Sequence, residues 1–295
     1  MEVVRTLRLA NLEGLQEVIV YQGILLSDSN LLADLKAEHL ETLSAPLDAY
    51  WEEALIGFSD HYELKIDGVR AGFYCLNADK QLVAFYLSQE YADHGEGALS
   101  HVISEQGVKA ALAGTNDSYF LSLCLDIAVS SRVHTLLFMD HKKVVPELDG
   151  SDLLSFDVAT DDDFADVFKH YCATSDSMDN DSIETGFENI KGYIRSMMDE
   201  HHIFVLREHG KLIATSECRI SKTQKPYADL GVIVAAENRR KGVGSYILAR
   251  TKEFCYERDA IPICSCEAGN MGSKKAIAKA GFVSRHRIVL THFGE

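Results

Sequence analysis

The stretch that decides the fold is residues 228–245, with the sequence ADLGVIVAAENRRKGVGS. An apolar, β-type run over 230–235 leads into three consecutive basic residues and then the pair Gly242 and Gly244. A helical pattern follows over 245–256. Glycines let a backbone approach an anion closely, and the free N–H groups of a helix's first turn point toward it. The stretch therefore predicts a strand–turn–helix unit that binds a pyrophosphate.

The spacing of the glycines excludes two other phosphate-binding motifs. A P-loop needs GxxxxGK[ST] and a Rossmann fingerprint needs GxGxxG, whereas this turn has the form Arg239-x-x-Gly242-x-Gly244. That form resembles the acetyl-CoA signature [RQ]xxGx[GA] of the GNAT N-acetyltransferase superfamily. A solvated basic start of a helix is the alternative that the motif alone leaves open.

A second pattern, at the family's spacing, supports the resemblance. Residues 261–267 are a strand candidate, and Asn270 opens a helical pattern that ends in Lys279-x-Gly281-Phe282. GNAT enzymes carry an Asn after a strand and then a helix that ends in KxGF. The resemblance covers residues 153–295 and implies the order β-α-α-β-β-β-α-β-α-β.

Composition limits the class of partner. The 295 residues carry 45 acidic and 29 basic side chains, a formal charge of −16. This balance argues against nucleic-acid or anionic-membrane binding, which needs a basic surface, and it permits cationic substrates. We find no signal peptide and no apolar run near the ~18 residues of a membrane span. The seven cysteines have no zinc or disulfide spacing, so we expect no metal site and buried free thiols in a cytoplasmic protein.

The first half of the chain repeats part of the sequence pattern of the second half. At an offset of 147 residues, Gly95 and Gly97 fall on Gly242 and Gly244, and the strand-like residues 82–87 fall on the strand before the turn. A polar segment with a proline and a glycine, 141–152, separates the halves. We therefore expect an α/β protein with two GNAT-like domains in tandem, 1–145 and 152–295. Two unrelated α/β domains are the alternative.

The repeated pattern differs at the residues of the turn that would bind the pyrophosphate. Ala92, Asp93 and His94 occupy the positions of the three basic residues, and Glu96 adds a carboxylate inside the turn. An acidic turn binds a pyrophosphate poorly because like charges repel. We expect that the first domain has lost cofactor binding. It would then support the second domain, cap its substrate cleft or mediate assembly, which leaves a homodimer open.

The resemblance implies which residues hold acetyl-CoA in the second domain. In GNAT enzymes the strand before the turn separates from its neighbour, and the pantetheine arm inserts there. By position, Val232, Ile233 and Val234 pair with the arm, and the Val234 N–H donates to the thioester carbonyl. Asn270 orients the cofactor near its sulfur, and Ser273 belongs to the same motif. The pyrophosphate would be bound by Arg239, Arg240, Lys241, Gly242, Val243, Gly244 and Ser245.

Direct transfer also needs a base for the acceptor ammonium and an acid for the departing thiolate. Glu217 and Asp229 are the available carboxylates on the two central strands, and burial can raise the pKa of either toward neutrality. We favour Glu217 slightly; a surface role for each carboxylate, and a water in place of a base, stay open. The position of the family's tyrosine acid is Ile277, which cannot donate a proton, so Ser273, Cys266 or a water would replace it.

The sequence thus predicts an enzyme that moves an acetyl group from acetyl-CoA to a primary amine of a small molecule. A non-catalytic acyl-CoA-binding protein and a protein N-acetyltransferase are the alternatives. The acidic side chains of Asp176, Asp179, Asp181 and Glu184 would attract a cationic acceptor, although a solvated acidic loop is the simpler explanation for them. The sequence does not name the acceptor.

Overall fold

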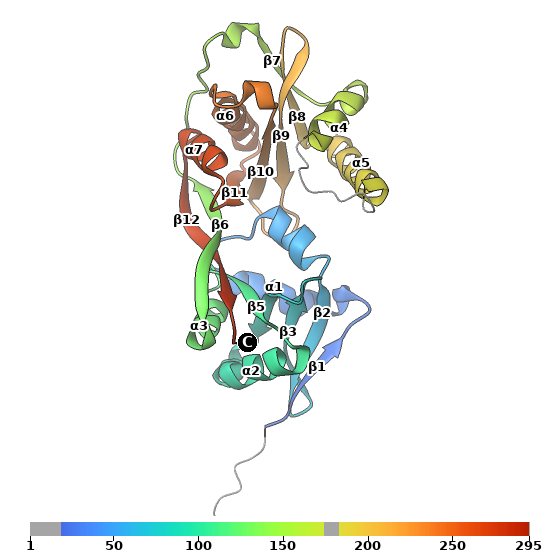
Figure 1. The fold of residues 1–295 in the computed structure, drawn as a ribbon, viewed down its shortest axis with the longest axis vertical. Helices are drawn as coiled ribbons and strands as arrows, with labels where there is room; N and C mark the ends of the chain where they lie inside the picture. The colour runs from blue at the N-terminus through green and yellow to red at the C-terminus, as the bar shows by residue number, and fades with distance from the viewer. Residues whose placement is uncertain (1–18, 174–182, 295) are drawn as a thin grey trace, which may run out of the picture.

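The two halves of the chain form the same succession of strands and helices along one sheet (Figure 1). The structure, a computed structural model, describes residues 19–173 and 183–294. The first half contains β1 (Tyr21–Leu25), α1 (Ala33–Thr42), η2 (Tyr50–Ile56), β2 (Asp60–Ile66), β3 (Val69–Leu76), β4 (Leu82–Leu87), α2 (Gly95–Gln106), β5 (Ala110–Gly114), α3 (Ser118–Ile127) and β6 (Ser130–Asp140). The second contains β7 (Leu154–Val158), α4 (Phe164–Cys172), α5 (Ile183–Asp199), β8 (Ile203–Glu208), β9 (Lys211–Ile220), β10 (Tyr227–Val234), α6 (Val243–Tyr256), β11 (Ile261–Glu267), α7 (Met271–Lys279) and β12 (Phe282–His292). Short 3-10 turns include η1 (Ser29–Leu32), η3 (Gln89–His94), η4 (Ser151–Leu153), η5 (Asp161–Asp163) and η6 (Ala236–Asn238).

Local sequence signals begin and end these elements in the same way in both halves. The hairpin β2–β3 turns through Asp67 and Gly68, and the hairpin β8–β9 turns through His209 and Gly210. All four residues have positive φ, which two-residue hairpin turns require and which glycine adopts without strain. The helix α3 begins where the Asp117 side chain accepts the N–H of Phe120.

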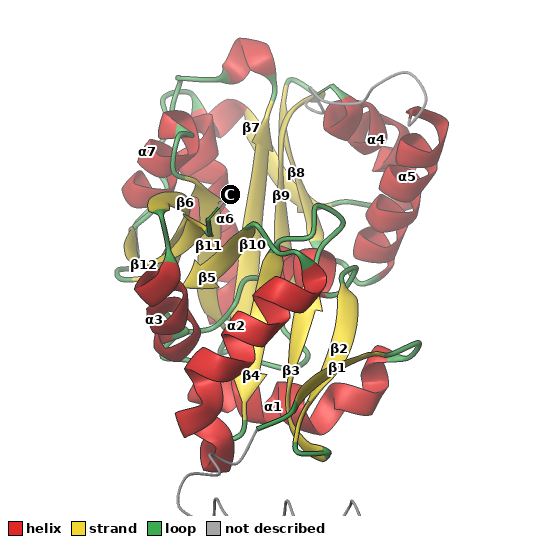
Figure 2. Ribbon diagram, turned by 60° about the horizontal axis from the view of Figure 1, so that its bottom comes forward, coloured by secondary structure: helices red, strands yellow, loops and turns green. Residues whose placement is uncertain are grey.

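The halves exchange their last strands. The twelve strands run in the order β1-β2-β3-β4-β5-β12-β6-β11-β10-β9-β8-β7. The last strand of the first half, β6, pairs with β11 of the second, and the last strand of the second half, β12, pairs with β5 of the first. The two exchanged strands also pair with each other along their length. One continuous sheet therefore joins the halves (Figure 2).

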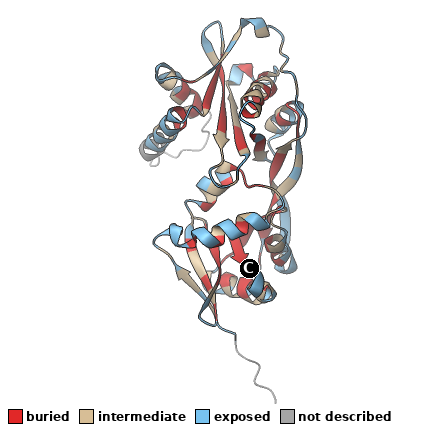
Figure 3. Cartoon of the chain, turned by 180° about the vertical axis from the view of Figure 1, so that it is seen from behind, coloured by how far each residue is buried: buried red, intermediate tan, exposed pale blue. Residues whose placement is uncertain are grey.

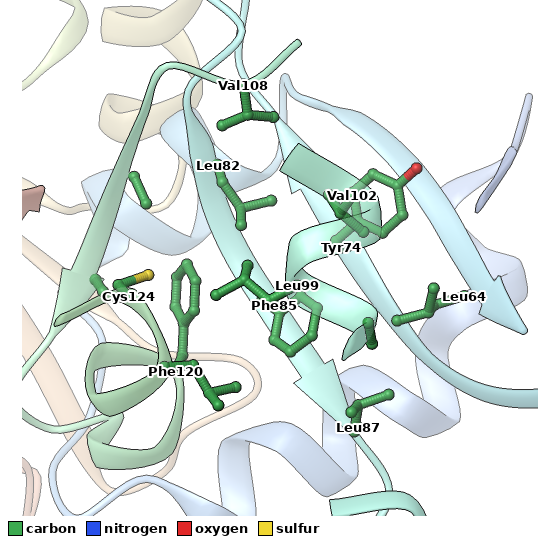
Figure 4. Close-up of a cluster of buried hydrophobic side chains, with 14 of the residues drawn as sticks. Leu64, Tyr74, Leu82, Phe85, Leu87, Leu99, Val102, Val108, Phe120 and Cys124 are labelled. Carbon is green, nitrogen blue, oxygen red and sulfur yellow. The ribbon is translucent and has the colours of Figure 1, made fainter. Parts of the chain in front are cut away.

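Helices cover both faces of the sheet, and each half has its own apolar core. In the first half, α2 and α3 pack Leu99, Val102 and Phe120 against Leu82 and Phe85 (Figure 4). In the second half, α6 and α7 cover one face and α4 and α5 the other. Buried residues accordingly line the sheet from end to end, and exposed ones lie on the outer sides of the helices (Figure 3).

The predicted order of elements is present in the second half, and the predicted fold class is confirmed. The segments predicted at 82–87 and 261–267 have the bounds that the structure gives them. The helix after the basic turn begins two residues earlier than predicted, at Val243. Asp176, Asp179 and Asp181 lie outside the described residues, as does the side chain of Glu184.

Candidate functional site

The basic turn between β10 and α6 exposes uncapped backbone donors. Gly242 is the residue before the helix, with φ of 89°, and no side chain caps the first turn. Because the first N–H groups of a helix have no partner within it, those that follow Gly242 are available to an anion. Arg239, Arg240 and Lys241 are exposed beside them. The Ser245 hydroxyl donates to the Gly242 carbonyl at 2.8 Å, so it holds the turn.

The strand before the turn separates from its neighbour. β10 and β11 pair in parallel only as far as Asp229 and Ile263. Beyond that point Ala235 donates its N–H to the Ile213 carbonyl on the β9 side, so alternation along the strand turns the N–H of Val234 toward the gap. The carbonyl of Val234 accepts a hydrogen bond from Arg239 Nε at 3.0 Å. The N–H of Val234 therefore faces the gap beside the turn, while the carbonyls of Val234 and Ile233 lie within hydrogen-bond distance of Arg239 and His170.

The second motif lies against the first. A Cβ built on Gly244 would lie 3.5 Å from the Ala276 Cβ on α7 and 3.5 Å from Cγ2 of Val234. Asn270 precedes α7, and its side-chain oxygen accepts the N–H of Ser273 at 3.0 Å. This bond uses the oxygen of Asn270 as a helix cap and leaves its amide exposed. β10, α6 and α7 thus bring the predicted cofactor residues together.

The matching turn of the first half is filled by its own side chains. A Cβ on Gly95 would lie 2.0 Å from the Tyr119 Oη, and one on Gly97 would lie 2.3 Å from the Tyr21 Oη. Tyr119 also donates to the carbonyl of Ala92. In the second half the nearest atom to a Cβ on Gly242 is Leu148 Cδ1 at 3.1 Å, so that turn is more open to a diphosphate than the turn of the first half.

Two carboxylates lie on the face of the sheet that α4 and α5 cover. Glu217 on β9 is opposite Gly231, and Asp229 on β10 is opposite Arg219. The Arg219 guanidinium donates to Asp229 and lies 3.2 Å from Glu217 Oε2, so it joins the two carboxylates. Asp229 also accepts the N–H of Ala49, from the first half, at 3.3 Å.

The two carboxylates differ in their surroundings. Both oxygens of Glu217 accept hydrogen bonds from tyrosines, Tyr171 at 2.6 Å and Tyr193 at 2.7 Å. Burial raises the pKa of Asp229 to about 7, although Arg219 opposes the increase, and the charges of Asp48 and Glu217 add to it. Burial and Glu217 hold the pKa of both tyrosines above the usual range, so they stay protonated and donate.

The position of the family's tyrosine acid is closed. Ile277 is 1% exposed and packs in the core beneath α7. Ser273 and Cys266 are half-buried, and burial raises the pKa of the Cys266 thiol. The thiol therefore stays protonated at neutral pH, as a proton donor must.

A cleft of about 580 Å³ lies elsewhere, between α1 and the loop 223–227. Its lining includes neither the basic turn nor the two carboxylates. The candidate site is therefore assigned from the chemistry of its side chains and not from the volume of a cleft. Within residues 19–173 and 183–294 no helix is long and apolar enough to cross a membrane, and no cluster of His, Cys, Asp or Glu could hold a metal ion.

Comparison with known proteins identifies the family. A family model described as an acetyltransferase (GNAT) domain matches residues 28–141, and one described as the acetyltransferase (GNAT) family matches residues 165–282. The chain belongs to the GNAT family. It carries two GNAT domains in tandem, as the repeated motifs predict, and together they place the protein among the acetyltransferases.

Solved structures match this tandem GNAT protein along its length. A GNAT-family acetyltransferase from Colwellia psychrerythraea is 26% identical, with a TM-score of 0.83 over 93% of this chain and 100% of that one. A tandem GNAT protein from the clavulanic acid biosynthesis pathway is 12% identical, with a TM-score of 0.62 over 92% and 98%. A GCN5-related N-acetyltransferase from Sphaerobacter thermophilus is 15% identical, with a TM-score of 0.55 over 92% and 94%. A search of curated proteins found no match.

The structure adds residues to the candidate site that the sequence did not assign to it. Lys279 brings its Nζ within 3.9 Å of a Cβ built on Gly242, so a fourth cation borders the turn. Arg219 links the carboxylates, and Tyr171 and Tyr193 donate to one of them. Asp48 and Ala49 come from the other half of the chain. Lys279 could have been found from the sequence because it belongs to the KxGF motif. The contacts between segments far apart in the sequence have no sequence signal.

Proposed function

We propose that the second half binds acetyl-CoA and transfers its acetyl group to a primary amine of a small molecule. The observation that carries the proposal is the uncapped first turn of α6 beside the separated strands β10 and β11. Backbone donors, the cations of Arg239, Arg240, Lys241 and Lys279, and a free strand edge meet at this place. These are the groups that a diphosphate and its amide-containing arm would require.

The residues have separate tasks in the proposed reaction. Acetyl-CoA would supply an activated acetyl thioester. The N–H of Val234 would donate to the thioester oxygen, where negative charge develops as the amine attacks. Arg239, which holds the Val234 carbonyl at 3.0 Å, would fix this part of the backbone and present its other donors to the diphosphate.

We assign the base to Asp229. Its raised pKa, about 7, lets it accept a proton near neutral pH. Five strand residues, roughly 16 Å, separate Asp229 from Val234, so the proton would reach it through a chain of waters. Glu217 already accepts two tyrosine hydrogen bonds and faces Arg219, so we assign it to holding that guanidinium beside Asp229. Cys266, Ser273 or a water would protonate the departing thiolate.

Contacts with the first half support a small acceptor. The Ala49 N–H donates to Asp229, whose side chain is 5% exposed, and a covered carboxylate suits a small acceptor better than a peptide. All seven cysteines are free thiols, and the Sγ atoms of Cys218 and Cys255, 3.4 Å apart, form a hydrogen bond and not a disulfide. These thiols favour a cytoplasmic location. The proposal leaves a homodimer open.

The buried Ile277 favours one second candidate, a protein that binds acyl-CoA without catalysis. Thiol release from acetyl-CoA across a panel of primary amines separates the two candidates. Calorimetry tests the site itself, because Arg239→Glu or Gly244→Glu should abolish acetyl-CoA binding without unfolding the protein. Arg132→Glu, an exposed reversal of charge on β6, is the matched control. Micromolar affinity in the turn variants would overturn the assignment of the site.

A further inference from the structure

The peptide bond between Ile233 and Val234 has its two polar groups on opposite sides of β10. Ala235 donates its N–H to Ile213 on the β9 side, so alternation turns the N–H of Val234 toward the gap beside β11. Ile233 is opposite Thr215 on β9, and its carbonyl lies on that side. One peptide therefore has its N–H at the proposed place of the thioester and its oxygen away from it.

A buried histidine reaches the oxygen of this peptide. His170 on α4 is 9% exposed, and its Nε2 lies 3.2 Å from the Ile233 oxygen. Because a carbonyl can only accept a hydrogen bond, Nε2 carries the proton and donates it. The same nitrogen carries a proton in the neutral ring and in the charged ring. The bond is therefore present in both protonation states of His170.

Packing alone does not account for a histidine at this position. Its neighbours on α4, Val167 and Tyr171, belong to an apolar cluster against which Ile233 packs. Burial lowers the pKa of His170, and the opposite charges of Arg239 and Glu237 act on it with opposite sign. An aliphatic side chain would be buried there at less cost than an imidazole. The hydrogen bond to Ile233 is thus what a histidine supplies and a leucine does not.

A donor on the carbonyl oxygen strengthens the N–H at the other end of the same peptide. The hydrogen bond draws electron density toward the oxygen through the amide resonance, which leaves the N–H more positive. Hydrogen bonds linked in this way reinforce one another by about 10–30% each. The N–H of Val234 is the donor proposed for the thioester oxygen, where negative charge develops during transfer. His170 is therefore linked to that oxygen through one peptide.

We propose that His170 is a positioning residue that polarises the Ile233–Val234 peptide, so that the N–H of Val234 binds the thioester oxygen of acetyl-CoA more strongly. This inference rests on the proposed function. It gives α4, which supplies none of the proposed cofactor contacts, a part in the transfer step. The role needs no contact between His170 and the reacting atoms, and no proton leaves the ring.

The test measures the carbonyl stretch of bound acetyl-CoA, labelled with ¹³C at the thioester carbon, by difference infrared spectroscopy without an amine present. A stronger hydrogen bond lowers this frequency, so His170→Leu should raise it relative to the wild type. His170→Gln, whose amide can donate from about the position of Nε2, should keep the wild-type frequency. We also expect kcat to fall about fivefold in His170→Leu, as the loss of one neutral hydrogen bond implies. The acetyl-CoA affinity should change less than about twofold, because most of the charge develops after binding.

Controls separate this role from a purely structural one. Val167→Ala removes packing from the same helix without touching the hydrogen bond, so it should lower the Tm and leave the frequency unchanged. His141→Leu changes an exposed histidine and should alter neither quantity. His170→Asn, whose shorter amide does not reach the carbonyl, should reproduce His170→Leu, and thermal unfolding shows that each variant folds.

The outcomes distinguish the inference from the function on which it rests. An unchanged frequency in His170→Leu and His170→Asn, with acetyl-CoA still bound, would overturn the inference while the proposed function stands. An equal shift in Val167→Ala would trace the effect to a loosened α4 and would overturn it as well. If the wild type does not bind acetyl-CoA, the proposed function is wrong and the inference is wrong with it.

Discussion

Arg219 and Asp229 lie opposite each other on β9 and β10, and the buried guanidinium donates to the carboxylate. Burial alone would disfavour both charges, yet Asp229 and Glu217 hold the pKa of Arg219 well above its usual value. The pKa of Asp229 is raised nonetheless, to about 7. The buried carboxyl group of Asp229 can therefore gain or lose a proton near neutral pH.

The first prediction concerns the pH dependence of transfer. A base acts only when it is unprotonated, so a raised pKa means that kcat/KM should fall as the pH drops below about 7. Asp229→Asn should lower kcat about 100-fold and remove this dependence. Glu217→Gln should keep it. Initial rates between about pH 5 and pH 9 decide the matter, and loss of the dependence in Glu217→Gln would transfer the role of base to Glu217.

A second prediction follows from the cation between the carboxylates. Arg219→Met leaves Asp229 and Glu217 buried without their shared charge, so the pKa of Asp229 should rise further and the midpoint of the pH–rate profile should move upward. Breaking a buried pair by removing one partner costs about 3–5 kcal/mol of unfolding free energy. Denaturant titration and the pH profile measure the two effects. An unchanged midpoint would contradict the coupling; the exposed change Arg132→Met is the control.

The sequence predicts those features of this protein that are local. Glycine spacing and consecutive basic residues mark the turn before α6, because the backbone chemistry of that turn depends on neighbouring residues. The exchange of β6 and β12 has no such signal: each strand has the same apolar alternation whether it pairs within its own half or with the other. The same limit hid Asp48, because the hydrogen bond that holds its segment beside Asp229 joins residues 180 apart in the sequence, Ala49 and Asp229.

A third prediction concerns the junction of the exchanged strands. Lys252 on α6 is 1% exposed; its ammonium donates to the carbonyls of Lys142 and Ala280 at 2.9 Å each and lies 2.6 Å from Asp140 Oδ1 at the end of β6. Lys252→Met would leave Asp140 without its buried counter-ion, although Tyr256 still donates to its Oδ2, and two carbonyls without this donor. We expect a loss of about 3–5 kcal/mol in the free energy of unfolding.

The control for this junction is Lys275→Met on the exposed side of α7, which should change stability by less than about 0.5 kcal/mol. Thermal or denaturant unfolding measures both variants. Equal stabilities would show that Lys252 contributes no more than a surface lysine. They would also show that the exchanged strands alone hold β6 in the second half.

The last prediction concerns how many acetyl-CoA molecules one chain binds. Tyr119 and Tyr21 occupy the first turn at the positions where Gly95 and Gly97 would admit a diphosphate, and Glu96 adds a negative charge there. Calorimetry should therefore give one site per chain for the wild type and none for Arg239→Glu. Tyr119→Ala should open space in the first turn without creating a second site, because the carboxylates of Asp93 and Glu96 still repel an anion. Two sites in the wild type, or one remaining in Arg239→Glu, would mean that the first half binds the cofactor after all.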